Sequence, residues 1–227
     1  MVVTDCNSIT GRFALTLKLA WRYLLVLAGL AAIFCLTHPV FAIVPGMLAA
    51  FILYFFRNPK RTVPAGENLI LSPADGVILE IGEVFEDRFF KDKTIRVSIF
   101  LSILDVHFNR SPLTGEVKYK HYRPGKFLPA FKSHASEYNE KNFLGIENSG
   151  IKVMICQITG FIARRITCWV DEGKNLAGGD LIGIIRFGSG TELFIPTETN
   201  LLVKKGDKVK AGETVIGILP GINRTMG

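Results

Sequence analysis

The chain has 227 residues, enough for one medium-sized domain with an appendage, and 48% of them are hydrophobic, more than a soluble domain usually needs. The formal net charge is +7, but the basic residues are scattered or lie beside apolar runs, so we expect anionic lipid headgroups and no nucleic acid as partners. The four cysteines form no C-x-x-C pair, so we expect neither a metal site nor a disulfide framework.

Two apolar runs near the N-terminus hold the excess hydrophobic residues. The first extends from Tyr23 to Thr37 and the second, after His38-Pro39, from Val40 to Phe56, and neither contains an acidic or basic residue. A spanning helix normally needs about 20 apolar residues, so we expect a tight apolar helical hairpin or a pair of tilted, partly inserted helices. A cleaved signal peptide is the competing interpretation of the first run, but no small-residue cleavage site follows it.

Basic residues lie on both sides of this hairpin. By the positive-inside rule both flanks face the cytoplasm, which places the remaining domain on the cytoplasmic side of the cell (inner) membrane. We therefore divide the chain into a basic N-terminal segment (1–22), a membrane-associated helical hairpin (23–56), a linker (57–67) and a soluble domain (68–227). The flanking basic residues are Arg12, Lys18 and Arg22 before the hairpin and Arg57, Lys60 and Arg61 after it.

The domain from residue 68 onward is expected to be mainly β. Apolar residues alternate with others from Ile95 to Leu101 and from Ile151 to Ile155, with Gly-rich turns between such segments, which favours a β-sandwich or barrel-like domain. The segment Leu201 to Leu219 resembles the paired hairpins of biotinyl and lipoyl carrier domains, but neither Met-Lys-Met nor Asp-Lys-Ala occurs. The polar segment from Phe131 to Phe143 is predicted to be an exposed loop or a short helix.

A serine lies between two glycines in Gly188-Ser189-Gly190, where an apolar strand-like run breaks. Glycines permit backbone conformations closed to other residues, so a strained turn can bring the Ser189 hydroxyl to the carbonyl carbon of Gly188. Attack there gives an ester, β-elimination leaves dehydroalanine, and hydrolysis of dehydroalanine gives a pyruvoyl group. Taken alone, however, Gly-Ser-Gly is first of all a flexible turn.

Four features occur in order along the chain: the apolar N-terminus, Ser72-Pro73-Ala74-Asp75-Gly76, the segment Leu101 to Pro112, and Phe187-Gly188-Ser189. Together they closely resemble the short, prokaryotic (type A) phosphatidylserine decarboxylase proenzymes, from about Arg57 to Leu219. The resemblance implies a membrane-associated lyase of phospholipid biosynthesis. Such an enzyme converts phosphatidylserine to phosphatidylethanolamine and CO2 through a Schiff base with its own pyruvoyl group, without an added cofactor.

The resemblance also implies roles for single residues. Ser189 would become the pyruvoyl group at the start of an α subunit (189–227), and Gly188 would become the C-terminus of a β subunit (1–188). Asp75 would support self-cleavage, and His107 would take part in the decarboxylation. The expected partners are the lipid substrate, the membrane, and the two subunits in a heterodimer whose further association is left open.

Arg110 departs from the family pattern, because longer bacterial members have a second histidine at this position. The base that activates Ser189 is therefore open among His107, His134 in the polar segment and a water held by Asp75, and we rank His107 first, with His121 as a weaker candidate. Arg110 is a candidate to bind the lipid phosphate or the substrate carboxylate, since a planar guanidinium suits both. His134 is a second candidate for substrate binding.

Two other functions stay open at this point. In the first, the chain would be an archaetidylserine (ether-lipid) decarboxylase, which would use the same chemistry on a different lipid backbone. Alternatively, it would be a non-enzymatic, membrane-tethered carrier-like or adaptor domain, in which Gly188-Ser189-Gly190 is only a hairpin turn.

Overall fold

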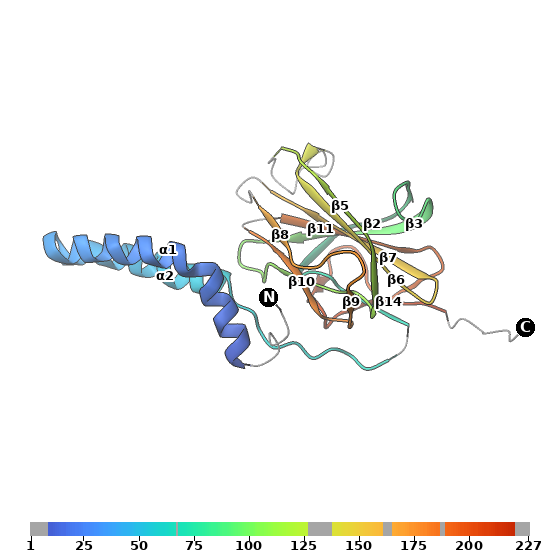
Figure 1. Cartoon of the computed structure of the whole chain (residues 1–227), viewed down its shortest axis with the longest axis horizontal. Coiled ribbons are helices and arrows are strands. Elements are labelled where there is room, and N and C mark those ends of the chain that lie inside the picture. Colours follow the sequence, from blue (N-terminus) through green and yellow to red (C-terminus); the bar gives the residue numbers. More distant parts are fainter. Residues whose placement is uncertain (1–8, 67, 127–137, 161–164, 187–188, 221–227) are drawn as a thin grey trace, which may run out of the picture. The chain divides into compact units, whose positions relative to one another are not determined.

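A computed structural model of the chain describes residues 9–66, 68–126, 138–160, 165–186 and 189–220. The chain divides into two units, Met1–Lys60 and Arg61–Gly227. The first unit is helical and the second is built of strands (Figure 1).

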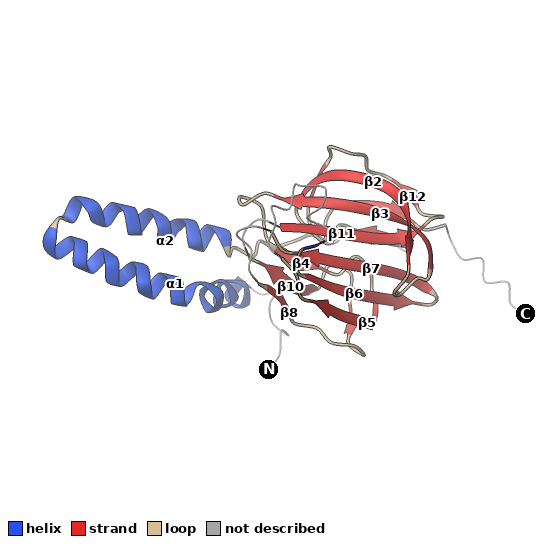
Figure 2. Cartoon of the chain, turned by 90° about the horizontal axis from the view of Figure 1, so that it is seen from above, coloured by secondary structure: helices blue, strands red, loops and turns tan. Residues whose placement is uncertain are grey.

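The N-terminal unit is a pair of apolar helices that lie side by side (Figure 2). Helix α1 (Ile9–Thr37) is followed by a 3-10 turn, η1 (Pro39–Ala42), and by helix α2 (Ile43–Phe55). Within the described residues, Thr10–Thr37 is the one helical segment long and apolar enough to cross a membrane, and Pro39–Phe55 is a shorter apolar helix. The predicted apolar helical hairpin is confirmed.

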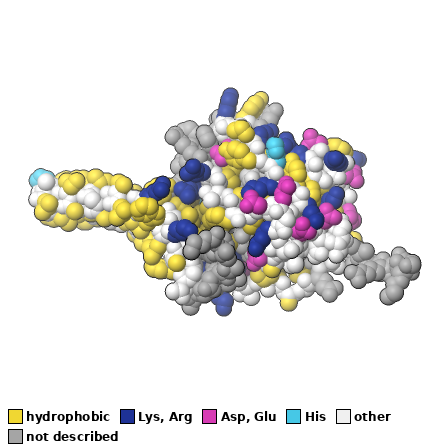
Figure 3. Space-filling model, in the orientation of Figure 1, with side chains coloured by type: hydrophobic (Ala, Val, Ile, Leu, Met, Phe, Trp, Pro, Cys, Tyr) yellow, Lys and Arg dark blue, Asp and Glu magenta, His cyan; other side chains and the backbone are white. Residues whose placement is uncertain are grey.

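Helix α1 begins well before the apolar run that predicted it. Arg12, Lys18 and Arg22 all lie within the helix. Arginine and lysine are good helix formers, so a charge in the sequence does not end a helix. Figure 3 shows hydrophobic side chains over most of the visible surface of this unit, whereas acidic and basic side chains are interspersed over the visible face of the β unit.

The second unit is built around a curved eight-stranded sheet in which all neighbouring strands are antiparallel (Figure 2). In spatial order its strands are β13 (Lys208–Val209), β2 (Gly76–Glu86), β3 (Asp92–Leu101), β11 (Ser189–Pro196), β7 (Ile151–Ile158), β6 (Lys141–Asn148), β5 (Gly115–Arg123) and β9 (Asn175–Leu176).

Two smaller antiparallel sheets complete the unit. The first has the order β1 (Leu69–Leu71), β14 (Val215–Ile218) and β12 (Asn200–Leu201), and the second has the order β4 (Phe108–Arg110), β10 (Leu181–Ile185) and β8 (Ile166–Cys168). The segment from Leu201 to Leu219 thus forms short strands separated by turns, as the carrier-like hairpin pattern predicted.

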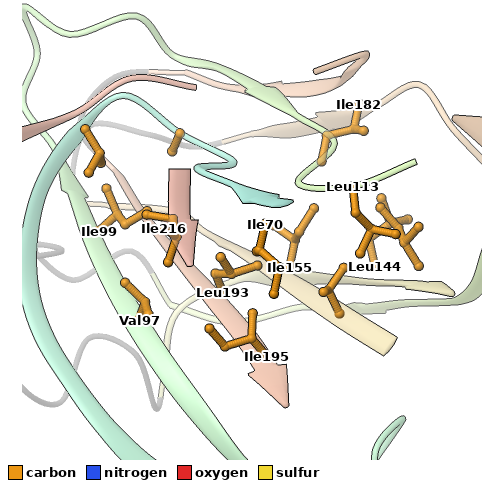
Figure 4. Packing of buried hydrophobic residues seen from close by; sticks show 14 of the residues in the cluster. Ile70, Val97, Ile99, Leu113, Leu144, Ile155, Ile182, Leu193, Ile195 and Ile216 are labelled. Atoms are coloured by element: carbon orange, nitrogen blue, oxygen red, sulfur yellow. The ribbon is translucent and has the colours of Figure 1, made fainter. Parts of the chain in front are cut away.

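The main hydrophobic core contains residues from the large sheet and from both small sheets. Ile99 and Leu193 of the large sheet meet Ile216 of the first small sheet, and Ile182 of the second belongs to the same cluster (Figure 4). Each of these side chains is at most 2% exposed. The predicted mainly β, sandwich- or barrel-like domain is confirmed.

The prediction of an exposed loop or short helix at residues 131–143 is wrong at its C-terminal end, and residues 131–137 lie outside the described residues. Residues Lys141 to Phe143 begin β6 and are buried. Their polar groups have partners: Lys141 Nζ lies 3.8 Å from Glu192 Oε2, and Asn142 Nδ2 donates to Gln157 Oε1 at 2.9 Å. Polar residues are buried where strand pairing supplies such partners, which a single segment of sequence does not reveal.

Candidate active site

One end of the large sheet brings two of the sequence motifs together. Strands β2 and β11 are both antiparallel to β3, so both begin where β3 ends. Val77 of β2 pairs with Phe100 of β3, which pairs in turn with Gly190 of β11. Asp75 precedes Val77 by two residues and Ser189 directly precedes Gly190, so both lie at this end, two strands apart at about 4.8 Å per strand.

Ser189 is the first residue of β11, and its backbone pairs with Leu101 at the end of β3. Gly188, the side chain of Ser189 and His134 lie outside the described residues. The structure therefore gives the position of the Ser189 backbone relative to the other candidate residues.

The turn that carries Asp75 is held by several hydrogen bonds. The hydroxyl of Ser72 donates to the carbonyl of Ala74 at 2.7 Å. Both Asp75 carboxylate oxygens accept from Arg61 Nη2, at 2.7 and 2.8 Å, and Oδ1 also accepts the backbone N–H of Ala211 at 2.8 Å. Asp75 thus has fixed partners on the linker and on the C-terminal part of the domain.

Gly76, directly after Asp75, is required by the close approach of β3. A Cβ at this position would lie 2.1 Å from the carbonyl oxygen of Phe100, and φ is +154°. We expect Gly76→Ala to lower the thermal midpoint of the detergent-solubilised chain by about 2–12 °C, because strained backbone costs about 1–3 kcal/mol. Gly82→Ala is the matched control in the same strand, where a Cβ meets nothing within 4 Å. Equal midpoints for both variants would contradict this account.

His107 lies directly before β4 and is fully buried. Its Nδ1 is 2.9 Å from the carbonyl oxygen of Asp105. Since a carbonyl oxygen only accepts, Nδ1 carries the hydrogen in this contact, and in the neutral ring Nε2 is the acceptor nitrogen. The Asp105 carboxylate accepts the backbone N–H of Ser102 at 2.8 Å, which holds the turn between β3 and His107.

Asn109, two residues after His107 in the chain, joins several strands through a buried relay of amides. Its Nδ2 donates to the carbonyl of Pro73 at 3.2 Å and to the hydroxyl of Thr191 at 3.1 Å. Its Oδ1 accepts from Gln157 Nε2 at 2.8 Å, and Gln157 accepts from Asn142 at 2.9 Å. Because buried amides without partners are costly, this relay fixes the Asp75 turn against the start of β11.

Arg110 follows Asn109 in β4, and successive strand residues point to opposite faces. Its side chain is buried, and Nη1 donates to the carbonyl of Gly179 at 2.8 Å. Its backbone N–H donates to the carbonyl of Pro73 at 2.9 Å, so Arg110 also helps to hold the turn before Asp75.

Sequence analysis missed two residues of this region. Arg61 was interpreted only as a basic flank of the apolar hairpin, and Asn109 was not singled out within its motif. The position of Asn109 between His107 and Arg110 was the available signal, because an amide inside a motif with two candidate residues is a candidate to position them.

Comparisons with known proteins assign the chain to a class of enzyme. Residues 48–217 match the family model described as phosphatidylserine decarboxylase. The chain is 50% identical over 200 residues to the phosphatidylserine decarboxylase proenzyme of Carboxydothermus hydrogenoformans, a match that covers 88% of this chain and 94% of the relative. It is 44% identical over 201 residues to the protein of that name from Symbiobacterium thermophilum, with the same coverage of 88% and 94%.

A third relative with this name, from Syntrophus aciditrophicus, is 45% identical over 192 residues, or 84% of this chain and 90% of the relative. These matches place the chain among the decarboxylases. It belongs to the phosphatidylserine decarboxylase family and is an enzyme of that type, as its motifs predicted.

Proposed function

We propose that this chain is a proenzyme that splits itself between Gly188 and Ser189 and then decarboxylates phosphatidylserine to phosphatidylethanolamine for phospholipid biosynthesis. The observation that carries the proposal is the position of Ser189 at the start of a central strand. The Asp75 turn lies at the same end of the sheet. The name proenzyme, which the relatives bear, supports processing of the chain.

Self-cleavage requires a balanced transfer of bonds and protons. The Ser189 oxygen loses its proton to a base and bonds to the Gly188 carbonyl carbon. The peptide C–N bond breaks, and its nitrogen takes up a proton. Loss of the Ser189 α-proton and departure of the Gly188 carboxylate give dehydroalanine, which water converts to a ketone with release of ammonia. Each step uses only the chain and water.

His107 is our first candidate for the base, because the contact between Nδ1 and the Asp105 carbonyl leaves Nε2 as the acceptor nitrogen. Asp75 is proposed to support the cleavage from its turn. The relay through Asn109 is proposed to keep that turn and the start of β11 in register, since it contacts both.

Strand pairing next to residue 189 would hold a carbonyl group at the N-terminus of the α subunit in a fixed position. Gly190, directly after it, pairs with Phe100 on one side and with Ile158 on the other. A pyruvoyl group at this end would supply a ketone that joins the substrate amine as a Schiff base with loss of water, and this conjugated system would take up the electron pair released when CO2 leaves. His107, or a water that it holds, then delivers the proton to the substrate α-carbon.

The apolar helices are proposed to hold the enzyme at the cytoplasmic face of the cell (inner) membrane. A diacyl lipid is nearly absent from water, so an anchored enzyme meets it by diffusion in the membrane plane. The basic residues Arg57 and Lys60, which follow α2, favour an anionic lipid surface.

Intact-mass analysis of the purified protein tests this proposal. We expect two chains, residues 1–188 and 189–227, the shorter one blocked at its N-terminus by the pyruvoyl group. The two subunits are expected to stay associated as a heterodimer, and any higher oligomer is measured in the same preparation. A single unbroken chain without decarboxylase activity would instead support the membrane-tethered adaptor.

The lipid product separates the remaining alternatives within the class. With equal amounts of diacyl and diether serine lipid, we expect CO2 release mainly from the diacyl form. Mass spectrometry of the products is the measurement. A strong preference for the diether lipid would identify an archaetidylserine decarboxylase instead.

We propose that Arg110 binds the phosphate or the carboxylate of the substrate, and Arg110→Lys tests this. Lysine keeps the charge but loses the planar fork, so we expect KM for phosphatidylserine to rise roughly tenfold while kcat changes little. An unchanged KM with a lower thermal midpoint would mean that Arg110 stabilises the fold through its contact with Gly179 and does not bind the substrate. His134 stays the second candidate for substrate binding.

A further inference from the structure

Arg61 lies in the linker, yet its side chain is only 6% exposed. Its Nη2 donates to both oxygens of Asp75, at 2.7 and 2.8 Å, and its Nη1 donates to Glu213 Oε2 at 3.3 Å. One planar cation thus lies between two carboxylates, a geometry for which guanidinium is well shaped. We call these three side chains the Arg61 clamp.

Backbone donors complete the Arg61 clamp. Ala211 N–H donates to Asp75 at 2.8 Å, and Thr62 N–H donates to Glu213 Oε1 at 3.0 Å. Burial by itself raises the pKa of Glu213, but the Thr62 N–H and the charge of Arg61 outweigh this and lower that pKa below its ordinary value. Glu213 is therefore ionised near neutral pH, as the ion pair requires.

The members of the Arg61 clamp lie on both sides of the proposed cleavage point. Arg61 and Asp75 precede residue 188, whereas Ala211 and Glu213 follow it. In this cluster three contacts therefore join one future chain to the other, in addition to the pairing of β11 with β3 and β7: Arg61 with Glu213, Thr62 with Glu213, and Ala211 with Asp75.

The contact between Arg61 and Asp75 has a consequence for the cleavage itself. Asp75 is only 13% exposed, so its carboxylate depends on the donors that the protein provides. Two of its hydrogen bonds come from Arg61 and one from Ala211. Without Arg61 the carboxylate would keep Ala211 as its one donor among the described residues and would rotate toward water.

We propose that Arg61 is a positioning residue for self-cleavage: it acts through Asp75, so that Ser189 is activated only when the linker is seated on the domain. This inference rests on the proposed function. Arg61 itself does not touch the reacting atoms. A displacement of about 1 Å in a reacting geometry can slow a reaction about 100-fold, which sets the size of the expected effect.

The test measures the rate at which the full-length precursor becomes two chains, by intact mass, in detergent micelles. We expect Arg61→Gln to slow conversion about 100-fold. The conversion rate of Arg61→Lys should lie between those of Arg61→Gln and wild type. Glu213→Gln is the matched control, because it weakens only the arm that does not touch Asp75, and it should slow conversion by no more than about fivefold. Added guanidinium ion should partly restore conversion of Arg61→Ala.

Two further measurements separate positioning from folding and from chemistry. Arg61→Gln in the uncleavable Ser189→Ala background should keep the far-UV circular dichroism of its parent. The mature fraction of Arg61→Gln should decarboxylate with kcat close to wild type, since the proposed role precedes turnover.

The outcomes separate this inference from the function on which it rests. If wild type splits and Arg61→Gln splits equally fast, the inference fails and the proposed function stands. If Glu213→Gln is as slow as Arg61→Gln and guanidinium restores nothing, Arg61 only fastens the linker, and the inference fails as well. A wild-type chain that never splits would overturn the proposed function, and the inference with it.

Discussion

Ser189→Ala is expected to yield one unbroken chain with no measurable decarboxylation. Alanine has no oxygen to attack the Gly188 carbonyl and cannot become a ketone, so neither the split nor the electron-accepting carbonyl can form. Residual activity should lie below about one part in 10⁶ of wild type, the lower end of enzymatic rate acceleration. Intact mass reports the split, and CO2 release from carboxyl-labelled phosphatidylserine reports the turnover.

Ser102→Ala is the matched control for that variant. Ser102 lies directly after β3 at the same end of the sheet, and its hydroxyl accepts a 3.2 Å bond from the backbone N–H of Leu104. This control should split and turn over as wild type does. Turnover by Ser189→Ala at the rate of Ser102→Ala would remove Ser189 from the mechanism.

Much of the fold follows from local patterns. The alternation from Ile95 to Leu101 and from Ile151 to Ile155 predicted β3 and β7, because each inward side chain is buried wherever the strand pairs. The short, glycine-bounded strands from Leu201 to Leu219 were likewise predicted from the pattern of that segment alone. The order of strands in the sheet is not, because it depends on pairing between segments far apart in the sequence, such as β3 with β11.

The candidate site shows the same difference between local patterns and contacts over long sequence distances. Motifs pointed to Asp75, His107 and Ser189 as candidates, since each lies in a short segment with a recognisable pattern. The partners of these segments were not apparent from the sequence: Arg61 contacts Asp75, which is 14 residues away beyond strand β1, and Asn109 contacts Thr191, which is 82 residues away in the chain. A basic residue beside an apolar run predicts a membrane flank, and only the folded linker shows that the Arg61 charge is balanced within the domain.

His107→Asn is expected to slow self-cleavage, decarboxylation or both by about 10²- to 10⁴-fold while the fold stays intact. The asparagine amide reaches the position of Nδ1 and can still donate to the Asp105 carbonyl, so the structural contact is kept. The position of Nε2, which alone can take up a proton, is left empty. The thermal midpoint should therefore stay within a few degrees of wild type.

The two rates distinguish the roles that His107 can have. Slow splitting with normal turnover of the mature fraction assigns His107 as the base for Ser189, whereas normal splitting with slow turnover assigns it as the source of the α-carbon proton. His107→Ala adds the loss of the Asp105 contact, so a larger fall in thermal midpoint than for His107→Asn is expected. If His107→Asn splits and turns over like wild type, the buried histidine only closes the turn before β4, and the base must be sought at His134 or at a water held by Asp75.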